Sequence, residues 1–241
     1  MKTALVTGAT GAIGTEICRM LAEQGYFLYI HFHKNDEKAK KLQKDLFHSF
    51  HVKSVIIHAD LSKEDGPKKL LNKLTKNVDV FIYNCGNTQY GLLTDFTNES
   101  IRETMQLHLL SAIEITKTLS KSMIQQKSGK IIMISSVWGE VGAACETVYS
   151  AAKGGLNTFV KALAKELAPS GINVNSIAPG VIETPMLDQF SEEEKDELAS
   201  DIPAGRFGQP QEVAHAAEYL ISEKSAYISG HILSVNGSWF T

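Results

Sequence analysis

The feature that most constrains the fold of this chain is the alternation, along its whole length, of short apolar runs with longer amphipathic stretches. Short runs rich in β-branched and aromatic residues are typical of buried strands, and stretches with apolar residues at helical spacing are typical of connecting helices. We therefore predict an α/β fold with one doubly wound parallel sheet of about seven strands. Right-handed crossovers would place helices on both faces of this sheet.

The predicted elements follow one another without a domain boundary. Strands are expected at residues 3–7, 27–32, 52–58, 79–83, 130–135, 173–177 and 232–235, and helices at residues 13–24, 36–47, 67–74, 98–126, 149–168 and 209–221. No Pro/Gly/Ser-rich linker or internal repeat divides them, so we predict a single domain over residues 1–241.

One segment, residues 181–207, is less regular than the rest and contains Pro185 and Pro203. An irregular stretch of this length in a compact domain is commonly a functional loop, so we expect it to be a substrate lid within the single domain. The acidic run Glu192–Glu194 inside it is interpreted as the favourable first turn of a helix rather than as a metal site.

Composition excludes several classes of protein. Hydrophobic residues make up 43% of the chain, charged residues make up 21%, and the formal net charge is −3, which is typical neither of a disordered chain nor of a nucleic-acid-binding protein. No apolar run approaches the ~18 residues of a membrane span, so we expect a soluble, cytoplasmic protein with no membrane partner. The cysteines Cys18, Cys85 and Cys145 are an odd number at wide spacings, which predicts reduced thiols and no metal site.

A glycine-rich turn follows the first predicted strand and leads directly into a helix, in the segment Thr7-Gly8-Ala-Thr10-Gly11-Ala12-Ile13-Gly14. Small residues let backbone amides approach an anion, and a helix N-terminus supplies unpaired N–H groups. Such a turn alone is a weak signal, but its place after the first strand predicts a Rossmann-like, dinucleotide-binding sheet. The pyrophosphate is expected against Gly8, Thr10, Gly11, Ile13 and Gly14.

The end of the second predicted strand indicates which dinucleotide binds. A carboxylate there would accept hydrogen bonds from the adenine ribose and repel a 2′-phosphate, but the first one appears only at Asp36. His33 and Lys34 offer donors and positive charge instead, which favours NADPH over NADH. Asp60, after the third strand, is expected either to accept from the adenine amino group or to cap the following helix.

Three polar side chains form a candidate catalytic set. Ser136 follows the fifth predicted strand, and Tyr149 and Lys153 lie four residues apart, on one face of a later helix. Tyrosine titrates near ~10, so a tyrosine acid useful at neutral pH needs its phenolate stabilised by roughly three pKa units, or about 4 kcal/mol. The lysine ammonium one turn away is expected to supply much of that stabilisation.

With these motifs in this order, the chain resembles the short-chain dehydrogenase/reductase family over essentially its full length. The family's Asn-Asn-Ala-Gly element appears as Tyr83-Asn84-Cys85-Gly86, and its Pro-Gly element appears as Pro179-Gly180-Val-Ile182-Glu-Thr184. The segments Arg206-Phe-Gly-Gln-Pro and Tyr227-Ile-Ser-Gly-His-Ile-Leu-Ser-Val-Asn-Gly resemble the 3-oxoacyl-[acyl-carrier-protein] reductase branch of the family.

The resemblance implies hydride transfer between a nicotinamide and a ketone substrate. Tyr149 would donate a proton to the developing alkoxide, Ser136 would hold the carbonyl oxygen, and Lys153 would bind the nicotinamide ribose and lower the tyrosine pKa. It also implies a homotetramer, and cofactor contacts from Asn84, Gly86, Tyr149, Lys153, Pro179, Gly180, Ile182 and Thr184.

Three positions depart from the family pattern. Ala12 replaces a glycine of the turn, and Tyr83 replaces the first asparagine of the Asn-Asn element. The family's fourth catalytic residue, an asparagine that holds a proton-relay water, aligns with His108. We expect His108 either to hold that water and titrate near pH ~6.5, or to be a structural residue of its helix.

The substrate end of the sequence leaves alternatives open. Reductases of the acyl-carrier branch dock an acidic carrier with cations near the active-site mouth, and the matching positions are Lys127 and Ser170, of which one carries no charge. Trp138, Glu140 and Glu146 lie on the loop expected to line the pocket. Two carboxylates there suit a cationic substrate better than a thioester on an acidic carrier, unless both are simply solvated.

The predicted function is therefore an NADPH-dependent carbonyl reductase similar to 3-oxoacyl-[acyl-carrier-protein] reductases. The loop from Ser136 to Glu146 and the histidine at 108 are also similar to reductases that act on a 5-aminopentanone group carried by a lysine of elongation factor P, which is the alternative. A non-catalytic dinucleotide sensor is a third alternative, against which the intact Ser136, Tyr149 and Lys153 argue.

Overall fold

The computed structural model contains one seven-stranded parallel sheet with the strand order β3-β2-β1-β4-β5-β6-β7. It describes residues 1–87, 89–185, 187 and 190–240. The strands are β1 (Thr3–Val6), β2 (Phe27–Phe32), β3 (Ser54–His58), β4 (Val80–Tyr83), β5 (Gly129–Ile134), β6 (Ile172–Pro179) and β7 (Ile232–Val235). The predicted doubly wound, Rossmann-like α/β fold is confirmed.

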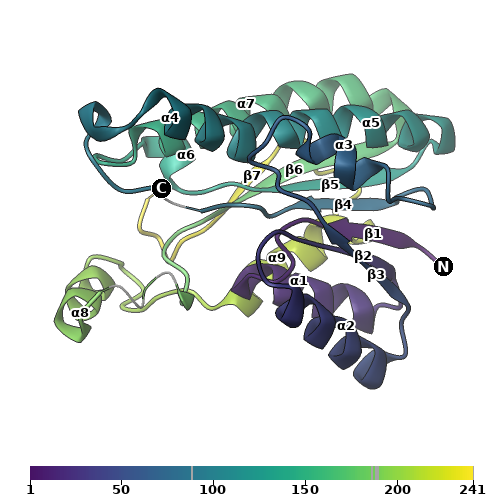
Figure 1. Cartoon of the computed structure of the whole chain (residues 1–241), viewed down its shortest axis with the longest axis horizontal. Helices are drawn as coiled ribbons and strands as arrows, with labels where there is room; N and C mark the ends of the chain where they lie inside the picture. The colour runs from purple at the N-terminus through teal and green to yellow at the C-terminus, as the bar shows by residue number, and fades with distance from the viewer. Residues whose placement is uncertain (88, 186, 188–189, 241) are drawn as a thin grey trace.

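Helices cover both faces of the sheet (Figure 1). One face is covered by α1 (Ala12–Glu23), α2 (Asp36–Phe50) and α9 (Pro210–Ile221), and the other by α3 (Gly66–Leu71), α4 (Asn98–Met105), α5 (Ser111–Gln126) and α7 (Thr147–Leu167). The core is split accordingly into two apolar clusters, one on each side of the sheet. On β2, for example, Leu28 and Ile30 belong to one cluster and Phe27 and Tyr29 to the other, because successive side chains of a strand point to opposite faces.

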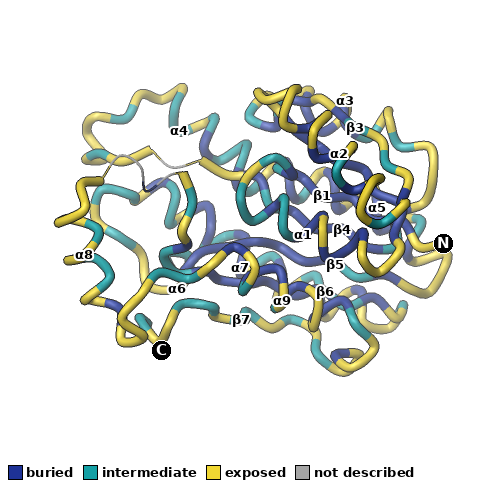
Figure 2. The backbone as a smooth tube through the Cα atoms, turned by 90° about the horizontal axis from the view of Figure 1, so that it is seen from below, coloured by how far each residue is buried: buried dark blue, intermediate teal, exposed yellow. Residues whose placement is uncertain are grey.

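The central strands are buried over their whole length, as Figure 2 shows. Every residue of β1, β2 and β4 is buried, which is why these strands read in the sequence as continuous apolar runs rather than as alternating ones. The one histidine in these three strands, His31, is buried as well. The loops at one edge of the sheet therefore follow the carboxyl ends of fully buried strands.

The long helix predicted over residues 98–126 is interrupted in the structure. Between α4 and α5 the chain forms a π-helical turn, η2 (Gln106–Leu110), with His108 at its centre. A π-helical turn inserted in a helix is uncommon and is frequently found at functional sites. The hydrophobic periodicity does not reveal it, because the turn keeps the helix axis and shifts the register by only one residue.

Other predicted boundaries shift by a few residues. The third predicted strand begins at Ser54 rather than at residue 52, because α2 extends to Phe50 and ends at His51, which has φ +55°. The short helix α6 (Trp138–Val141), which begins two residues after Ser136, was not predicted.

The segment at residues 181–207 contains the helix α8 (Glu192–Ser200), which lies apart from the sheet in Figure 1. Ser191 and Glu194 form a capping box at its start, so the acidic run does form the first turn of a helix. Ile182 and Gly208 form a β-bridge at the base of the segment. Residues 186, 188 and 189 of the predicted lid lie outside the described residues.

Within the described part of the chain, no helix has both the length and the apolar character that crossing a membrane requires. The same residues contain no group of three or more His, Cys, Asp or Glu side chains placed to hold a metal ion. Cys18, Cys85 and Cys145 are free thiols, and the first two are buried.

The contact between α1 and the ends of β1 and β4 leads to a prediction about stability. A Cβ atom on Gly14 would lie 2.3 Å from the Gly8 carbonyl oxygen and 2.8 Å from the Asn84 side-chain nitrogen. Gly14→Ala should therefore lower the free energy of unfolding by about 1–3 kcal/mol, as overpacking does. Denaturant titration measures this loss.

Gly11→Ala is the matched control, because a Cβ at that position meets only the Gly8 oxygen, at 3.4 Å. It should leave the free energy of unfolding close to that of the parent. Equal stability of the two variants would contradict the packing argument.

Candidate active site

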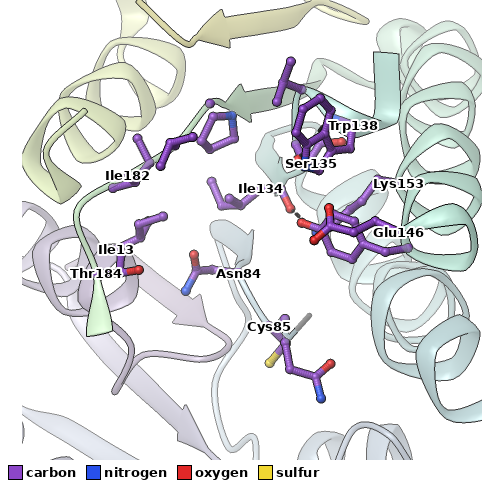
Figure 3. A pocket seen from close by; sticks show the side chains of 18 of the residues that line it. Ile13, Asn84, Cys85, Ile134, Ser135, Trp138, Glu146, Lys153, Ile182 and Thr184 are labelled. Carbon is purple, nitrogen blue, oxygen red and sulfur yellow. Dashed lines mark hydrogen bonds between the residues drawn. The ribbon is translucent and has the colours of Figure 1, made fainter. Parts of the chain in front are cut away.

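The residues predicted to act together converge on one cavity at the carboxyl edge of the sheet (Figure 3). The edge is formed by the loops that follow β1, β4, β5 and β6, which is where ligands bind in open parallel sheets. The predicted residues that line the cavity are Ile13, Asn84, Gly86, Ser136, Trp138, Glu146, Tyr149, Lys153, Pro179, Gly180, Ile182 and Thr184.

The glycine-rich turn is held from two sides. Gly8 has φ +61°, and its carbonyl oxygen accepts hydrogen bonds from the Gly11 amide at 3.1 Å and from the Asn84 side chain at 3.1 Å. Thr10 lies inside this turn, and α1 begins at Ala12. The first amides of a helix have no partner within the helix, and Gly11 at the N-cap has no side chain to bind them.

Tyr83 and Asn84, which stand where the family has its Asn-Asn element, have separate roles. The Asn84 amide donates to the Thr7 hydroxyl at 3.0 Å, so this residue ties the end of β4 to the turn after β1. Tyr83 is fully buried, and its hydroxyl donates to the carbonyl of Leu107 in η2. The tyrosine that replaces the family asparagine therefore supports the π-helical turn.

Ser136, Tyr149 and Lys153 lie together in the cavity. Ser136 follows β5, its hydroxyl is hydrogen-bonded to Tyr149, and it accepts the Trp138 amide at 3.2 Å. Lys153 is buried one helical turn after Tyr149 in α7, and its ammonium donates to the Ile134 carbonyl at 2.8 Å. The ammonium nitrogen lies 5.6 Å from the centre of the Tyr149 ring.

Burial determines the protonation of this set. It raises the pKa of Tyr149 to about 12, although the hydrogen bond with Ser136 acts in the opposite direction. It lowers the pKa of Lys153 to about 8, a shift that the Cys85 thiol partly opposes. The tyrosine pKa is therefore raised rather than lowered as expected, because desolvation of the phenolate dominates. Tyr149 is protonated at neutral pH, as a proton donor must be.

His108 lies directly behind Tyr149. The two rings meet edge to face with their centres 4.9 Å apart, and His108 Nε2 lies 2.9 Å from the Asn87 carbonyl oxygen. A carbonyl only accepts, so Nε2 carries the proton and Nδ1 is an acceptor. Nδ1 is buried and has no hydrogen-bond partner among the described residues.

The expected titration of His108 near pH 6.5 is wrong. Burial lowers its pKa to about 3, and the charge of Lys153 acts in the same direction, against the hydrogen bond to Asn87. The imidazole is therefore neutral at neutral pH. A Cβ on Gly86 would lie only 3.1 Å from the His108 ring, so the absence of a side chain at Gly86 allows the histidine ring to pack there.

A second cavity adjoins the first through Cys85 and Asn87, which line both. His33, Lys34 and Asp60 line it, at the ends of β2 and β3. Asp60 accepts from the amide and hydroxyl of Ser62 at 3.0 and 2.7 Å, and His33 lies 3.5 Å away. Burial acts to raise the Asp60 pKa, but these hydrogen bonds and the nearby His33 and Lys63 outweigh it, so the pKa is lowered. The N-cap of α3 is Asp65, so Asp60 is not the helix cap that the sequence left as an alternative.

These features fit a dinucleotide. Gly8 and Gly14 let α1 pack closely on the ends of β1 and β4, the first amides of α1 have no partner within the helix, and Ile13 from that first turn lines the first cavity. The residues Ile13, Asn84, Tyr149, Lys153, Ile182 and Thr184 could hold the nicotinamide end. His33, Lys34 and Asp60 could hold the adenosine end.

A family model described as short chain dehydrogenase matches residues 2–195. The chain belongs to this family. It is 49% identical over 238 residues to the uncharacterized oxidoreductase YmfI of Bacillus subtilis (strain 168), covering 99% of this chain and 98% of the relative. It is also 36% identical to the 3-oxoacyl-[acyl-carrier-protein] reductase FabG of Aquifex aeolicus (strain VF5), covering 99% of this chain and 97% of that protein.

Solved structures of the family superpose closely on this short-chain dehydrogenase. The 3-oxoacyl-[acyl-carrier protein] reductase from Brucella melitensis has a TM-score of 0.93 at 26% identity and covers 100% of this chain and 92% of its own. YwfH, described as an NADPH dependent reductase involved in bacilysin biosynthesis, has a TM-score of 0.94 at 26% identity, with coverage of 100% and 98%. The protein is therefore an oxidoreductase, in a family that uses NAD(P)H, and resembles reductases of ketones.

The structure separates the predicted substrate residues. Trp138 and Glu146 line the first cavity. Glu140 is not among the described residues that line this cavity: its side chain is exposed and accepts a hydrogen bond from the Ser234 hydroxyl at 3.1 Å. Trp239, which the sequence did not single out, lines the cavity and packs on Trp138 with ring centres 5.0 Å apart. No motif marks Trp239, because only the tertiary structure returns the end of the chain to the active site.

The two positions matched to carrier-docking cations lie elsewhere. Lys127 precedes β5 and Ser170 precedes β6, so both are at the edge where the parallel strands begin. Ser136 and the catalytic cavity are at the opposite edge. The expectation that Lys127 and Ser170 flank the mouth of the active site of their own chain is therefore wrong.

The pKa values of Lys153 and His108 lead to a prediction about pH. The pH dependence of kcat/KM for the cofactor reports the pKa values of essential groups in the free enzyme. It should be constant from pH 5 to 7, because His108 stays neutral, and should fall as the pH rises through about 8, where Lys153 loses its charge. A separate ionisation near pH ~6.5 in the parent that disappears in His108→Asn would contradict the neutral histidine.

Proposed function

We propose that this protein is an NADPH-dependent ketone reductase similar to 3-oxoacyl-[acyl-carrier-protein] reductases. The observation that carries the proposal is the meeting of Ser136, Tyr149 and Lys153 in a cavity beside a turn suited to a pyrophosphate. The similarity to FabG and to an acetoacetyl-CoA reductase of Acinetobacter sp. (strain RA3849), which is 36% identical, supports it. A pure dinucleotide sensor would have no need of the three groups.

The three catalytic side chains divide the work of the reaction among them. When NADPH is bound, it supplies the hydride. The Ser136 hydroxyl donates to the ketone oxygen, and the Trp138 amide orients the serine. Tyr149, which burial keeps protonated, transfers its proton to that oxygen as negative charge develops there. The Lys153 ammonium, anchored on the Ile134 carbonyl, holds the nicotinamide ribose and stabilises the phenolate that the transfer leaves.

His108 is proposed to take part in returning the proton to Tyr149. Its Nδ1 is an unpartnered acceptor in a buried position close to Lys153 and Tyr149. An acceptor there suits the relay water that the family holds with asparagine. The neutral imidazole keeps this acceptor at every pH above about 4, because its pKa is about 3.

The preference for NADPH rests on the second cavity. Lys34 and His33 are the cationic and donor groups at the end of β2, and the first carboxylate of that segment, Asp36, belongs to α2. A 2′-phosphate is stabilised by such a corner and repelled by a carboxylate. The NADPH dependent reductase YwfH, which has the same fold, supports the same choice.

A second candidate, reduction of the 5-aminopentanone group on elongation factor P, is favoured by Glu146. This side chain lines the cavity (Figure 3), as Tyr149 does, and its Oε2 is buried with no hydrogen-bond partner among the described residues. Burial raises its pKa, as expected for a carboxyl that lacks a cationic neighbour. An ammonium group of the substrate would supply that neighbour, whereas an acyl thioester has none.

Three broader features complete the proposal. The chain acts as one domain over residues 1–241, with residues 181–207 as a substrate lid beside the cavity. It assembles as a homotetramer, as the family resemblance implies, and works in the cytoplasm. The base of the proposed lid is tied to the cavity through Ile182 and Leu187, which line it.

Removal of the Tyr149 hydroxyl tests the proposed reaction. Tyr149→Phe should lower kcat by roughly 10²- to 10⁴-fold, the usual contribution of a positioned acid, while the Kd for NADPH stays near the parental value. Oxidation of NADPH and of NADH with a ketone substrate, followed by absorbance, measures it and should show faster turnover with NADPH. Near-full activity of the variant would show that another group is the acid.

The identity of the ketone is tested by comparing two substrates. Glu146→Gln should raise KM for aminopentanone-bearing elongation factor P by about tenfold, because the loss of a charged partner costs roughly 1–2 kcal/mol, and should leave KM for an acetoacetyl thioester unchanged. Glu140→Gln, on the same loop but outside the cavity, is the control. If the protein turns over the thioester faster than the elongation factor, the result would favour the function of a 3-oxoacyl-[acyl-carrier-protein] reductase.

A further inference from the structure

His31 connects the ends of four strands under the proposed cofactor site. It lies on β2, is 1% exposed, and lines the second cavity. Its Nε2 lies 3.0 Å from the Ala59 carbonyl oxygen after β3, and its Nδ1 lies 3.2 Å from the Gly8 amide after β1. The Cys85 thiol after β4 is 3.6 Å from the same Nδ1.

These partners determine the tautomer of the ring. The Ala59 carbonyl can only accept a hydrogen bond, so Nε2 carries the proton, and the Gly8 amide can only donate, so Nδ1 is the acceptor. A protonated ring would place a second N–H against the Gly8 N–H. Burial, which outweighs the Ala59 hydrogen bond, lowers the His31 pKa to about 4, so the neutral ring is present at neutral pH.

The Gly8 peptide is where this arrangement meets the pyrophosphate turn. Its N–H is held by His31, and its carbonyl is held by the Gly11 amide and the Asn84 side chain. Gly8 has φ +61°, a conformation that glycine adopts without strain, and this conformation lets both polar groups of the peptide reach these partners. The acceptor at Nδ1 therefore helps to fix the orientation of the turn, together with the Ala9 amide, which donates to the His31 carbonyl at 2.9 Å, and with the two Asn84 hydrogen bonds.

We propose that His31 is a positioning residue for dinucleotide binding, which acts by holding the Gly8 amide through Nδ1. The proposal rests on the proposed function only in that the cavity binds NADPH or NADH. Because the pyrophosphate is common to both, His31 affects both cofactors equally, unlike Lys34, which lies at the ribose corner. It does not touch Ser136, Tyr149 or Lys153 in any contact that the structure records, so the chemical step is unaffected.

Two substitutions distinguish the contribution of the Nδ1 hydrogen bond from that of the Nε2 hydrogen bond. In His31→Asn the side-chain oxygen can take the place of Nδ1 and accept from Gly8, but the donor to Ala59 is lost. In His31→Gln the longer side chain can place its amide nitrogen near Nε2 and donate to Ala59, but the acceptor for Gly8 is lost. Each variant removes one of the two hydrogen bonds that the ring makes to backbone atoms, so comparable losses of thermal stability are expected.

Isothermal titration calorimetry of the full chain with NADPH and with NADH gives the decisive measurement. His31→Gln should raise Kd about tenfold for both cofactors, equivalent to roughly 1.4 kcal/mol. His31→Asn should stay within about twofold of the parent. Lys34→Ala is the control and should weaken NADPH alone. The value of kcat at saturating cofactor should be unchanged in both His31 variants.

Equal weakening by the two His31 variants, in proportion to their loss of thermal midpoint, would show a merely structural histidine and overturn the proposal. Unchanged Kd values in His31→Gln would overturn it as well. The two proposals can fail separately. If the Kd values follow the predicted pattern but the parent protein reduces no ketone, the role of His31 is supported and the proposed function is rejected.

Discussion

Close packing of the first turn of α1 against the ends of β1 and β4 is the constraint on which the active-site edge depends. Gly14 lies so near the Gly8 carbonyl that no side chain fits between them, and Asn84 reaches the same carbonyl from β4. Because the seven strands are parallel, their carboxyl ends bring the turn, Ser136 and the end of β6 to one edge. A displacement of α1 would therefore separate the cofactor side of the cavity from its catalytic side.

Desolvation is the second general influence, and it shifts the pKa values of four groups at this edge of the sheet in the direction that favours their neutral forms. It raises the pKa of Tyr149 and lowers those of Lys153, His108 and His31. The two histidines are neutral as a result, and each has one donor and one acceptor nitrogen in a defined place. Hydrogen-bond direction, rather than charge, is what these buried imidazoles contribute.

Much of the site could be predicted from the sequence because its motifs are local. The glycine-rich turn and the four-residue spacing of Tyr149 and Lys153 depend on backbone geometry over a few residues, and the structure brings them together. The side chains around them were predicted less well. The titration of His108 near pH 6.5 and the position of Lys127 near the mouth were both wrong, because they depend on burial and on which edge of the sheet a loop occupies.

The sequence by itself determined the alternation of strands and helices, the order of the motifs and the chemistry of each reactive side chain, since these follow from local periodicity and residue type. Only the tertiary structure decided that Trp239 lines the cavity, that Glu146 faces it while Glu140 does not, and that His31 joins the ends of four strands. The physical reason is that burial and hydrogen-bond partners arise from residues far apart in the chain, which packing alone brings together.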